Sequence, residues 1–332
     1  MKIFVTGGAG FIGSNFLRYW TAKYPKDFIT VLDAFTYAGN EATIKDLKKN
    51  KQIQWISGDV RDSKVVERAM AGHENIFHFA AETHVDRSIQ DSQIFLKTNL
   101  LGTQTLLEQA RKNKIKKFVF ISTDEVYGST VQGSFSEESP LQPNSPYAVS
   151  KAAADLLCKS YWITYQLPVL ITRCCNNYGP FHYPEKVIPL FITHLLEGKK
   201  IPVYGNGKNV REWIHALDHA SAIDAVFRKG KLGEVYNVGT QEELSNISLA
   251  KLILKLMDQT SAQIQFVPDR LGHDFRYALN SKKLRSLEWK PKYSFETALQ
   301  ETIAWYRENT QWWKTLKNKS SYQKYHQKQY GK

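Results

Sequence analysis

The 332-residue sequence contains only three cysteines, Cys158, Cys174 and Cys175. An odd number without metal-ligand spacing indicates neither a disulfide framework nor a zinc site, so we expect three ordinary buried thiols and no bound metal. The sequence also lacks long apolar runs, and its N-terminus lacks a charged segment followed by an apolar one. We therefore expect a globular protein of the cytoplasm that does not enter a membrane.

Acidic residues are fewer than basic ones, with 32 Asp and Glu against 45 Lys and Arg and a formal net charge of +13. Six of the lysines lie in residues 314–332, a stretch without any acid. Tyr and His alternate with Lys there, which would allow stacking on nucleobases, but solvated disorder is the usual outcome of this composition. Because no nucleic-acid-binding motif accompanies the charge, we expect an anionic small-molecule substrate and no nucleic-acid partner.

The sequence does contain apolar runs of strand length that alternate with segments of helical periodicity. The runs are KIFVTGG, FITVLD, IQWISGD, IFHFAAE and KFVFISTDE. This alternation is typical of an α/β fold, a Rossmann-like doubly wound parallel sheet. Such sheets bind ligands at the carboxyl ends of their strands, where these runs end in small or polar residues.

The first run leads into TGGAGFIGSN, in which Gly7, Gly10 and Gly13 open a predicted helix. Gly7 would allow the tight turn, Gly10 the close approach of a pyrophosphate, and Gly13 the packing of helix on strand. Asp33 closes the second run about 20 residues later. Its carboxylate would accept hydrogen bonds from a ribose and repel a 2′-phosphate, which favours NAD over NADP.

Two further strand ends suit the same cofactor. Asp59 and Val60 would border an adenine, and the small Ala80 and Ala81 leave room for a cofactor. A solvated turn explains Asp59 equally well.

Two short stretches suggest acid–base chemistry. Tyr147 and Lys151 in YAVSK are four residues apart, so on a helix the ammonium could lower the pKa of the phenol, although such pairs are common on helix surfaces. The strand-like FVFIST ends at Thr123, and Asp124 and Glu125 follow. Neighbouring strand residues point to opposite faces, so both acids could face one substrate only if the chain turns there. An acid and a base would then flank a pair of sugar carbons, whereas the alternative is a solvated turn.

Together these residues resemble the extended short-chain dehydrogenases, and within them the nucleoside-diphosphate-glucose 4,6-dehydratases, most closely the dTDP-glucose type. The resemblance extends from Met1 to about Trp305 and depends on TGGAGFIGSN, LDAFTYAGN, AAETHVDRSI, STDEVYG, SPYAVSKAAAD, NNYGPFHYPEKVIP, YGNGKNVREWIHALDH, YNVG and DRLGHDFRYAL. The glycine motif and YxxxK mark only the superfamily, whereas Asp124 with Glu125 after Thr123 marks the dehydratases.

The resemblance implies an NAD-dependent lyase that converts dTDP-glucose to dTDP-4-keto-6-deoxyglucose and water. The implied catalytic residues are Thr123, Asp124, Glu125, Tyr147 and Lys151. Tyr147 would take the proton of the sugar 4-hydroxyl as a phenolate favoured by Lys151 and the nicotinamide charge. Glu125 would remove the C5 proton while Asp124 protonates the departing C6 hydroxyl, and Thr123 would orient the 4-hydroxyl. The product class belongs to deoxysugar biosynthesis, as in the formation of dTDP-rhamnose.

The resemblance also implies two sets of binding residues. The cofactor set is Gly7, Gly10, Phe11, Ile12, Gly13, Asp33, Thr36, Asp59, Val60, Ala80, Ala81, Thr83, Asn99, Tyr147, Lys151 and Asn177. The substrate set is His84, Thr123, Asn176, Lys186, Val187, Pro202, Tyr204, Arg211, Asn246, Arg270 and His273. Arg211 has the clearest physical basis, because a guanidinium can bind phosphate oxygens through paired donors.

For the architecture, the resemblance implies two lobes and a tail. We expect an NAD-binding lobe over 1–175 to which 213–240 returns, a substrate lobe of 176–212 and 241–313, and a basic tail over 314–332. A helix is expected over 213–230. Helices around 93–112 and 146–165 would pair with those of a second copy in a four-helix bundle, which gives a homodimer.

Three alternatives remain at this point. A UDP-glucose 4,6-dehydratase would use the same catalytic residues, since uracil and thymine differ by one methyl group. A sugar-nucleotide epimerase or decarboxylase would share the fold and cofactor but usually lacks the acid pair. A catalytically silent regulator that uses its basic tail has no physical need for all five catalytic residues.

Overall fold

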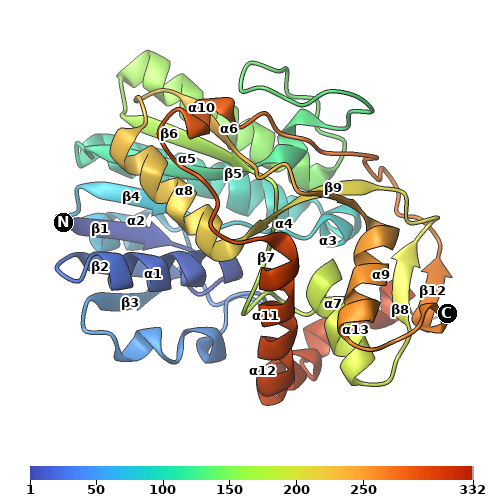
Figure 1. Cartoon of the computed structure of the whole chain (residues 1–332). Coiled ribbons are helices and arrows are strands. Elements are labelled where there is room, and N and C mark those ends of the chain that lie inside the picture. The colour runs from blue at the N-terminus through green and yellow to red at the C-terminus, as the bar shows by residue number, and fades with distance from the viewer. Residues whose placement is uncertain (331–332) are drawn as a thin grey trace.

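The computed structural model describes residues 1–330, and its largest element is a seven-stranded parallel sheet (Figure 1). The strands are β1 Lys2–Thr6, β2 Phe28–Asp33, β3 Ile53–Ser57, β4 Asn75–His78, β5 Lys117–Thr123, β6 Val169–Cys174 and β10 Val235–Val238. Their spatial order is β10-β6-β5-β4-β1-β2-β3. The winding reverses between β1 and β4, which opens a crevice at the carboxyl ends of these strands. The predicted Rossmann-like fold is confirmed.

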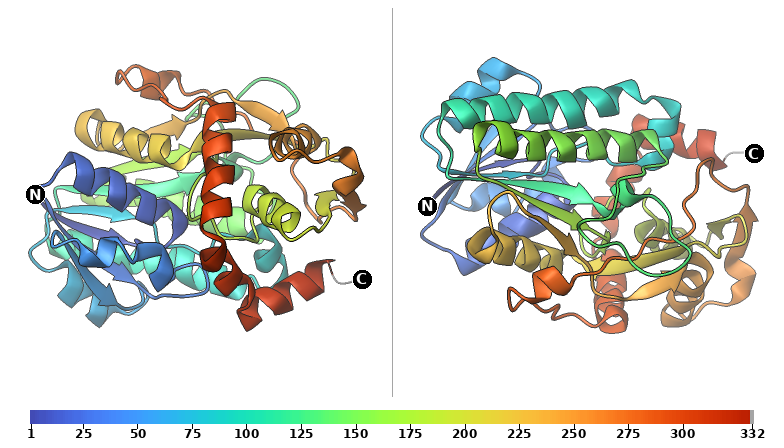
Figure 2. Two further views of the ribbon diagram at one scale, coloured as in Figure 1. Left: turned by 60° about the horizontal axis from the view of Figure 1, so that its bottom comes forward. Right: turned by 90° about the horizontal axis from the view of Figure 1, so that it is seen from above.

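Helices cover both faces of this sheet (Figure 2). On one face α1 Phe11–Lys23 packs against α8 Ala216–Lys229. The other face carries α2 Ser63–Met70, α5 Gly102–Lys112 and α6 Pro146–Tyr165. Because both faces are covered, the central strands are buried along their length, which explains why they read as continuous apolar runs in the sequence.

Short helical segments connect the longer elements. Before α5 the chain forms α3 Val85–Gln90, α4 Gln93–Phe95 and the π-helix η3 Leu96–Leu101. The helix predicted around 93–112 therefore continues through α4, η3 and α5. The 3-10 turns are η1 Glu41–Ile44, η2 Leu47–Lys49, η4 Asp124–Tyr127 and η5 Ser261–Gln263.

Local sequence explains where α6 starts and ends. The hydroxyl of Ser145 accepts a hydrogen bond from the Ala148 amide at 3.1 Å, and Pro146 occupies the first turn, where a missing N–H costs nothing. Gln166 ends the helix in the left-handed conformation, with φ of 54°. Tyr147 consequently lies in the first turn of α6, beside the sheet edge.

The remaining elements form a second layer of structure beside the sheet. β7 Asn176–Tyr178, β9 Val210–His215 and β11 Glu243–Ser245 form a three-stranded sheet, and β8 Ile201–Tyr204 pairs with β12 Ile264–Val267. The helices here are α7 Val187–Leu196, α9 Asn246–Leu256 and α11 Phe295–Glu308, with the short α10 Lys282–Arg285 near β10. A separate apolar core that includes Trp213, Ile253 and Leu299 lies between them.

The helix predicted over 213–230 is wrong in its first three residues. Trp213, Ile214 and His215 belong to β9 and pair with β7, and α8 begins at Ala216. The strand is favoured because Trp213 and Ile214 are buried on its two sides, in different apolar clusters.

The expectation of a solvated C-terminal tail is also wrong for residues 314–330. They form the end of α12 Thr310–Lys317 and all of α13 Ser320–Tyr330, while residues 331–332 lie outside the described part. The buried side chains of this region include Trp313, Leu316, Tyr322 and Tyr325. Burial of these mostly aromatic side chains stabilises the helices despite the many lysines.

Membrane-spanning helices and metal-binding clusters are both absent from residues 1–330. No helix among them is long and apolar enough to cross a membrane. No group of His, Cys, Asp and Glu side chains in this range is arranged to hold a metal ion, and all three cysteines are buried and free.

A buried ion pair connects α6 to the sheet and gives a stability prediction. Asp155 on α6 accepts hydrogen bonds at 2.8 and 2.9 Å from Arg173 on β6, and neither side chain is more than 4% exposed. Asp155→Asn should lower the free energy of unfolding by about 3 kcal/mol, because the guanidinium stays buried without its counter-charge. Urea unfolding at a fixed protein concentration measures this. Glu41→Gln, which breaks the exposed pair of Glu41 with Lys48, should change stability by about 0.5 kcal/mol or less; equal losses would contradict the prediction.

Candidate active site

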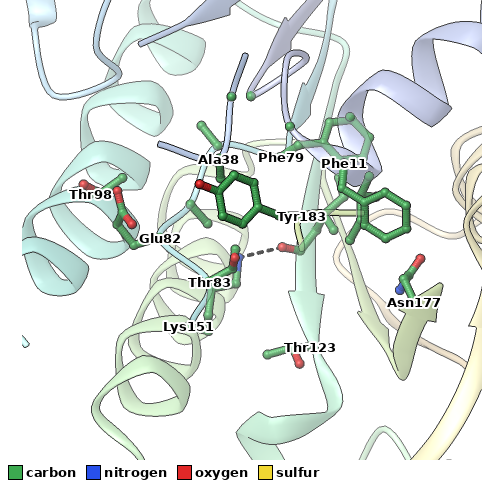
Figure 3. A pocket seen from close by; sticks show the side chains of 18 of the residues that line it. Phe11, Ala38, Phe79, Glu82, Thr83, Thr98, Thr123, Lys151, Asn177 and Tyr183 are labelled. Carbon is green, nitrogen blue, oxygen red and sulfur yellow. Dashed lines mark hydrogen bonds between the residues drawn. The ribbon is translucent and has the colours of Figure 1, made fainter. Parts of the chain in front are cut away.

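A cavity of about 310 Å³ lies at the carboxyl edge of the main sheet (Figure 3). Thr98 and Glu82 lie at one end in this view, and Phe11 and Asn177 at the other. Most of the predicted cofactor residues line it: Gly7, Gly10, Phe11, Ile12, Gly13, Asp33, Thr36, Asp59, Val60, Ala80, Ala81, Thr83, Tyr147, Lys151 and Asn177. The sheet topology therefore brings these separate motifs to one place.

The turn after β1 is shaped to admit a phosphate group. Gly7 has φ of +74°, and a Cβ there would lie 2.5 Å from the backbone nitrogen of Ala80. A Cβ on Gly13 would lie 2.3 Å from the Gly7 carbonyl oxygen, so the backbone of α1 packs directly against the backbone of the turn. Gly10 immediately precedes α1, whose first amides offer positive partial charge to an anion in the cavity.

Asp33 at the end of β2 provides acceptors beside this turn. One carboxylate oxygen accepts the Ala9 amide and the other the Phe35 amide, each at 2.8 Å. Each oxygen has a second lone pair, which can accept a ribose hydroxyl. Burial raises the pKa of Asp33, and the two amides oppose that shift. The glycine turn and this carboxylate therefore fit a dinucleotide without a 2′-phosphate, such as NAD.

Asp59 lines the cavity as predicted, and it pairs with Arg61, which the sequence analysis did not single out. Its carboxylate accepts hydrogen bonds from the Arg61 guanidinium, one of them at 2.6 Å, and from the Arg61 amide at 2.8 Å. Burial raises the pKa of Asp59, but the bonds from Arg61 outweigh burial and lower it overall. The side chain is thus fixed and ionised beside Val60.

Tyr147 and Lys151 both lie in the cavity wall and are buried, but they do not pair directly. The Lys151 ammonium donates to the Ile121 carbonyl oxygen at 2.7 Å, and no hydrogen bond joins it to Tyr147 within residues 1–330. Burial raises the pKa of the Tyr147 phenol, and the charge of Glu125 raises it further. Lys151 can therefore favour a phenolate only through its charge, not through the direct contact that helix spacing suggested.

The turn predicted after β5 is present and directs both acids toward the site. β5 ends at Thr123 and the 3-10 turn η4 starts at Asp124. The Thr123 hydroxyl donates to Asp124 Oδ1 at 3.1 Å and accepts from the Glu125 amide at 3.3 Å. Asp124 and Glu125 then both line the cavity, together with Tyr147.

The two carboxyl groups differ in their electrostatic surroundings. Burial raises the pKa of Asp124 well above its usual value, and the neighbouring Glu125 adds to the rise. Burial also raises the pKa of Glu125, but the positive charges of Arg270, Lys186 and Arg211 oppose it. These surroundings favour the protonated form more at Asp124 than at Glu125.

A second cavity of about 150 Å³ adjoins the first at Glu125, which lines both. Its walls contain these predicted substrate residues: His84, Asn176, Lys186, Val187, Pro202, Tyr204, Arg211, Asn246, Arg270 and His273. Thr123 lines the first cavity instead. Three cations, Lys186, Arg211 and Arg270, line this cavity, and their positive charge suits a diphosphate.

Asn99 is the predicted cofactor residue that the structure places elsewhere. Its side chain is buried in η3, where it donates to the Glu82 oxygen at 2.9 Å and accepts from the Glu82 amide at 2.8 Å. It also donates to the Ser150 hydroxyl at 2.8 Å. Asn99 therefore holds the loop that follows β4 and does not itself line the cavity.

Several lining residues were missed in the sequence. In the first cavity they include Glu82, Thr98, His182, Tyr183 and His219, and in the second Asp86, Glu185, Tyr277 and Tyr330. His182 stacks on Phe11 with ring centroids 4.2 Å apart, and His219 holds the Asn177 amide oxygen at 2.8 Å. Asp86 lies two residues from His84 in AAETHVDRSI, so the quoted motif could have indicated it.

The ionisation of Lys151 gives a pH prediction. Burial lowers the pKa of its ammonium to about 8, so the positive charge near Tyr147 is lost as the pH rises above that value. We expect kcat/KM to fall on the alkaline side of pH 8. Lys151→Arg keeps a charge at these pH values and should weaken the alkaline fall, although the larger group lowers the overall rate. Identical alkaline profiles for both proteins would rule out Lys151 as the titrating group.

Comparison with known proteins agrees with this site. The family model described as GDP-mannose 4,6 dehydratase matches residues 4–302. A dTDP-glucose 4,6-dehydratase of Streptomyces niveus is 48% identical over 96% of this chain and 96% of its own length. The low-salt glycan biosynthesis protein Agl12 of Haloferax volcanii is 48% identical over 92% of this chain and 98% of its own.

Solved structures extend the comparison to the fold. The dTDP-glucose 4,6-dehydratase DesIV of Streptomyces venezuelae, determined with NAD and thymidine diphosphate bound, superposes with a TM-score of 0.94 at 48% identity, covering 95% of this chain and all of that one. A UDP-glucose 4-epimerase of Thermotoga maritima superposes with a TM-score of 0.87 at 29% identity, covering 93% of this chain and 100% of that one. The shared fold does not separate dehydratase from epimerase, but sequence identity and the family match do. The chain belongs to the GDP-mannose 4,6 dehydratase family of nucleotide-sugar enzymes.

Proposed function

We propose that this protein is an NAD-dependent dTDP-glucose 4,6-dehydratase, which converts dTDP-glucose to dTDP-4-keto-6-deoxyglucose and water. The observation that carries the proposal is the acid pair at the turn η4: Asp124 lines the first cavity, and Glu125 lines both. Relatives at 44–48% identity over nearly the whole chain, named as enzymes of this activity, support it. The product would enter deoxysugar biosynthesis, as in the formation of dTDP-rhamnose.

The first cavity would hold the cofactor. Bound NAD would supply the hydride acceptor for C4, the hydride donor for C6 and a positive charge beside Tyr147. The glycine turn would receive its pyrophosphate and Asp33 a ribose, as their geometry allows. This assignment fits the cofactor in the solved dehydratases of Streptomyces venezuelae and Bacillus anthracis.

Tyr147 would accept the proton of the sugar 4-hydroxyl, assisted by Lys151 and Thr123. Its burial keeps the phenol protonated until additional positive charge lowers its pKa, so the base forms only in a loaded site. The ammonium of Lys151, fixed by Ile121, supplies part of that charge. Thr123 would hold the 4-hydroxyl in line with the phenol.

Glu125 and Asp124 would then eliminate water across C5 and C6. The new 4-ketone makes the C5 proton acidic, and Glu125, whose carboxylate is favoured by three nearby cations, would remove it. Asp124, which stays protonated, would deliver its proton to the leaving C6 hydroxyl. Burial of the pair keeps bulk water away from the intermediate.

Mass spectrometry tests the proposed reaction directly. Purified protein is incubated separately with dTDP-glucose and UDP-glucose, without added reductant, in ordinary water and in D2O. We expect the sugar nucleotide to lose the mass of one water and, in D2O, to gain one deuterium at C5. The conversion should be faster with dTDP-glucose than with UDP-glucose. Faster conversion of UDP-glucose would identify a UDP-glucose 4,6-dehydratase instead. An isomer of unchanged mass, detected by NMR, would identify an epimerase, and an unchanged sugar would refute a dehydratase of either donor.

We also propose a homodimer that forms through a four-helix bundle. The outer faces of η3 and α6 carry exposed apolar side chains, namely Leu96, Leu101, Val149, Leu156 and Ile163. Both helices lie on one side of the sheet and pack together, so a second copy could cover them. Light scattering should give twice the chain mass. Leu156→Glu should shift the measured mass toward that of one chain, whereas Glu67→Gln on the exposed surface of α2 should not; a single-chain mass for wild type would refute the dimer.

The division into lobes remains a proposal as well. An NAD-binding lobe of 1–175 with 213–240 is supported by α8, which packs on the main sheet, and by β10, which is a strand of it. The chain reaches both elements after passing through β7, α7 and β8 of the other lobe. The substrate lobe would be 176–212 and 241–313. We propose the cytoplasm as the compartment, consistent with three free thiols in the described chain.

A further inference from the structure

Two segments of the chain, residues 34–43 and residues 181–186, meet at the wall of the first cavity, and we call them together the clasp. The first segment follows β2 and the second follows β7. Residues of both line the cavity, among them Ala38 and Tyr183, which are labelled in Figure 3. The clasp therefore brings parts of the chain that are far apart in the sequence to one side of the cofactor site.

The first segment lies immediately beside Asp33, the predicted acceptor for a ribose. A Cβ on Gly39 would lie 2.8 Å from Asp33 Oδ1 and 3.5 Å from the Cβ of Ala9 in the glycine turn. A dinucleotide whose pyrophosphate lies at that turn and whose ribose meets Asp33 would therefore pass alongside this segment.

Aromatic and charged side chains join the two segments to each other. The rings of Tyr37 and Tyr183 meet edge to face, with centroids 5.6 Å apart. The guanidinium of Arg87 on α3 lies over the Tyr37 ring, 4.2 Å from its centroid, and donates to Glu185 Oε2 at 2.8 Å. The Glu185 side chain is only 1% exposed, so this charged contact is shielded from water. Both contacts resist separation of the segments.

Trp312 on α12 connects the same two segments a second time. Its indole Nε1 donates to Thr43 Oγ1 at 3.3 Å, and its ring meets that of Phe181 edge to face at 5.9 Å. Thr43 Oγ1 also accepts from the Asn40 side-chain amide at 3.0 Å, which extends the connection toward the cavity. The family model ends at residue 302, so Trp312 lies beyond the part of the sequence that it matches.

Each segment also contains a phenylalanine with a left-handed backbone conformation. The angle φ is 48° at Phe35 and 69° at Phe181. A bulky residue adopts this conformation only where surrounding contacts hold it there. The Phe181 ring packs on Trp305, with centroids 4.7 Å apart, and lies 3.9 Å from the Arg18 guanidinium carbon. The shape of the clasp therefore depends on tertiary contacts and not on local preference.

The proposed reaction requires that the cofactor stay bound from its first step to its last. The hydride removed from C4 has to return to C6 of the same sugar, and loss of NADH between these steps would leave the sugar oxidised. The sugar nucleotide, in contrast, has to leave after every turnover. The cofactor site therefore needs a slow exit and the substrate site a fast one.

We propose that the clasp retains the cofactor during the reaction: Tyr37 and Tyr183 close the first cavity beside the adenosine half of NAD, and Trp312 holds the two segments together. Tyr37 and Trp312 are positioning residues, because they act through the segments that line the cavity. This inference rests on the proposed function, since it takes NAD as the resident carrier of the hydride. It predicts that the clasp sets the rate of cofactor release and leaves substrate affinity nearly unchanged.

The test measures the dissociation rate of NADH from the full chain without any sugar present. Protein loaded with NADH is mixed with excess NAD in a stopped-flow instrument, and the fall in the fluorescence of bound NADH gives the rate. Tyr37→Ala and Trp312→Ala should each raise the rate about tenfold, which corresponds to about 1.4 kcal/mol of lost aromatic contact. Tyr37→Phe retains the ring and should stay within about twofold of wild type. Thr43→Val, which removes the acceptor for Trp312, should raise the rate about threefold.

Turnover of dTDP-glucose separates retention of the cofactor from a general disturbance of the fold. In Tyr37→Ala, free NADH should pass through an ultrafiltration membrane during turnover, together with oxidised sugar that has not been reduced at C6. Added NAD at saturating concentration should restore kcat, and KM for dTDP-glucose should remain near that of wild type. A disturbed fold would raise KM as well and would not respond to NAD.

Lys314→Ala on the exposed surface of α12 is the control and should release NADH at the wild-type rate. Wild-type release rates in both Tyr37→Ala and Trp312→Ala would overturn the inference. Thr43→Val conserves the shape of the side chain, so it replaces Trp312→Ala in this comparison if that variant does not fold. A wild-type protein that binds no NADH, or that leaves dTDP-glucose unchanged, would refute the proposed function. Normal conversion with equal release rates in all variants would refute only the clasp.

Discussion

Glu125→Gln should lower the rate of product formation by a factor of about 10³, with the sugar halted after its oxidation at C4. The amide retains the shape of the side chain but cannot accept the C5 proton. Tyr147 and Lys151 are unchanged, so the 4-hydroxyl still loses its proton and reduced cofactor accumulates. Stopped-flow absorbance of NADH should therefore show a rise that persists, and the sugar should take up no deuterium at C5 from D2O.

Glu67→Gln on the exposed surface of α2 gives a matched control with the same chemical change. It should show wild-type turnover and no persistent NADH. A Glu125→Gln protein that still exchanges its C5 proton at the wild-type rate would show that another group is the base. Asp124 would be the first candidate, since it lines the same cavity.

Tyr147→Phe should abolish the first step and reduce kcat about 10³-fold or more, without any rise of NADH absorbance. In the proposed mechanism the Tyr147 phenol, which lines the first cavity, receives the 4-hydroxyl proton, and phenylalanine fills the same space without an acceptor. Because the ring is retained beside Phe95, stability should change little. Calorimetry with thymidine diphosphate should show nearly wild-type affinity.

Tyr165→Phe removes a hydroxyl from the exposed end of the same helix and is the control for Tyr147→Phe. It should leave both NADH formation and turnover unchanged. Accumulation of NADH at the wild-type rate in Tyr147→Phe would transfer the role of first base to another residue. Weak binding of thymidine diphosphate by that variant would instead indicate a disturbed site.

Much of the active site was predictable because its signals are local. Gly7 is required by a turn whose φ is positive, and Ser145 with Pro146 marks the start of α6. The turn after Thr123 followed from the alternation of side chains along a strand, since only a turn lets Asp124 and Glu125 face one ligand. Parallel strands with buried faces then bring their carboxyl ends together, so motifs far apart in the chain meet.

Other predictions failed where distant contacts outweighed local pattern. Asn99 was assigned to the cofactor, but the backbone of Glu82 satisfies its amide. Residues 314–330 looked like a solvated tail because lysine dominates their composition, whereas the aromatic stripe that folds α13 requires a surface supplied by residues such as Asp86 and Tyr204.

The sequence by itself determined the Rossmann-like sheet and the glycine turn with Asp33, and it indicated the candidate catalytic residues, since each of these signals depends on short stretches of sequence. Only the tertiary structure decided the electrostatic difference between Asp124 and Glu125 and the place of the C-terminal helix. Arg270, Lys186 and Arg211 act on Glu125 from 61 to 145 positions away in the chain, so their effect on its pKa exists only after folding has brought all four together.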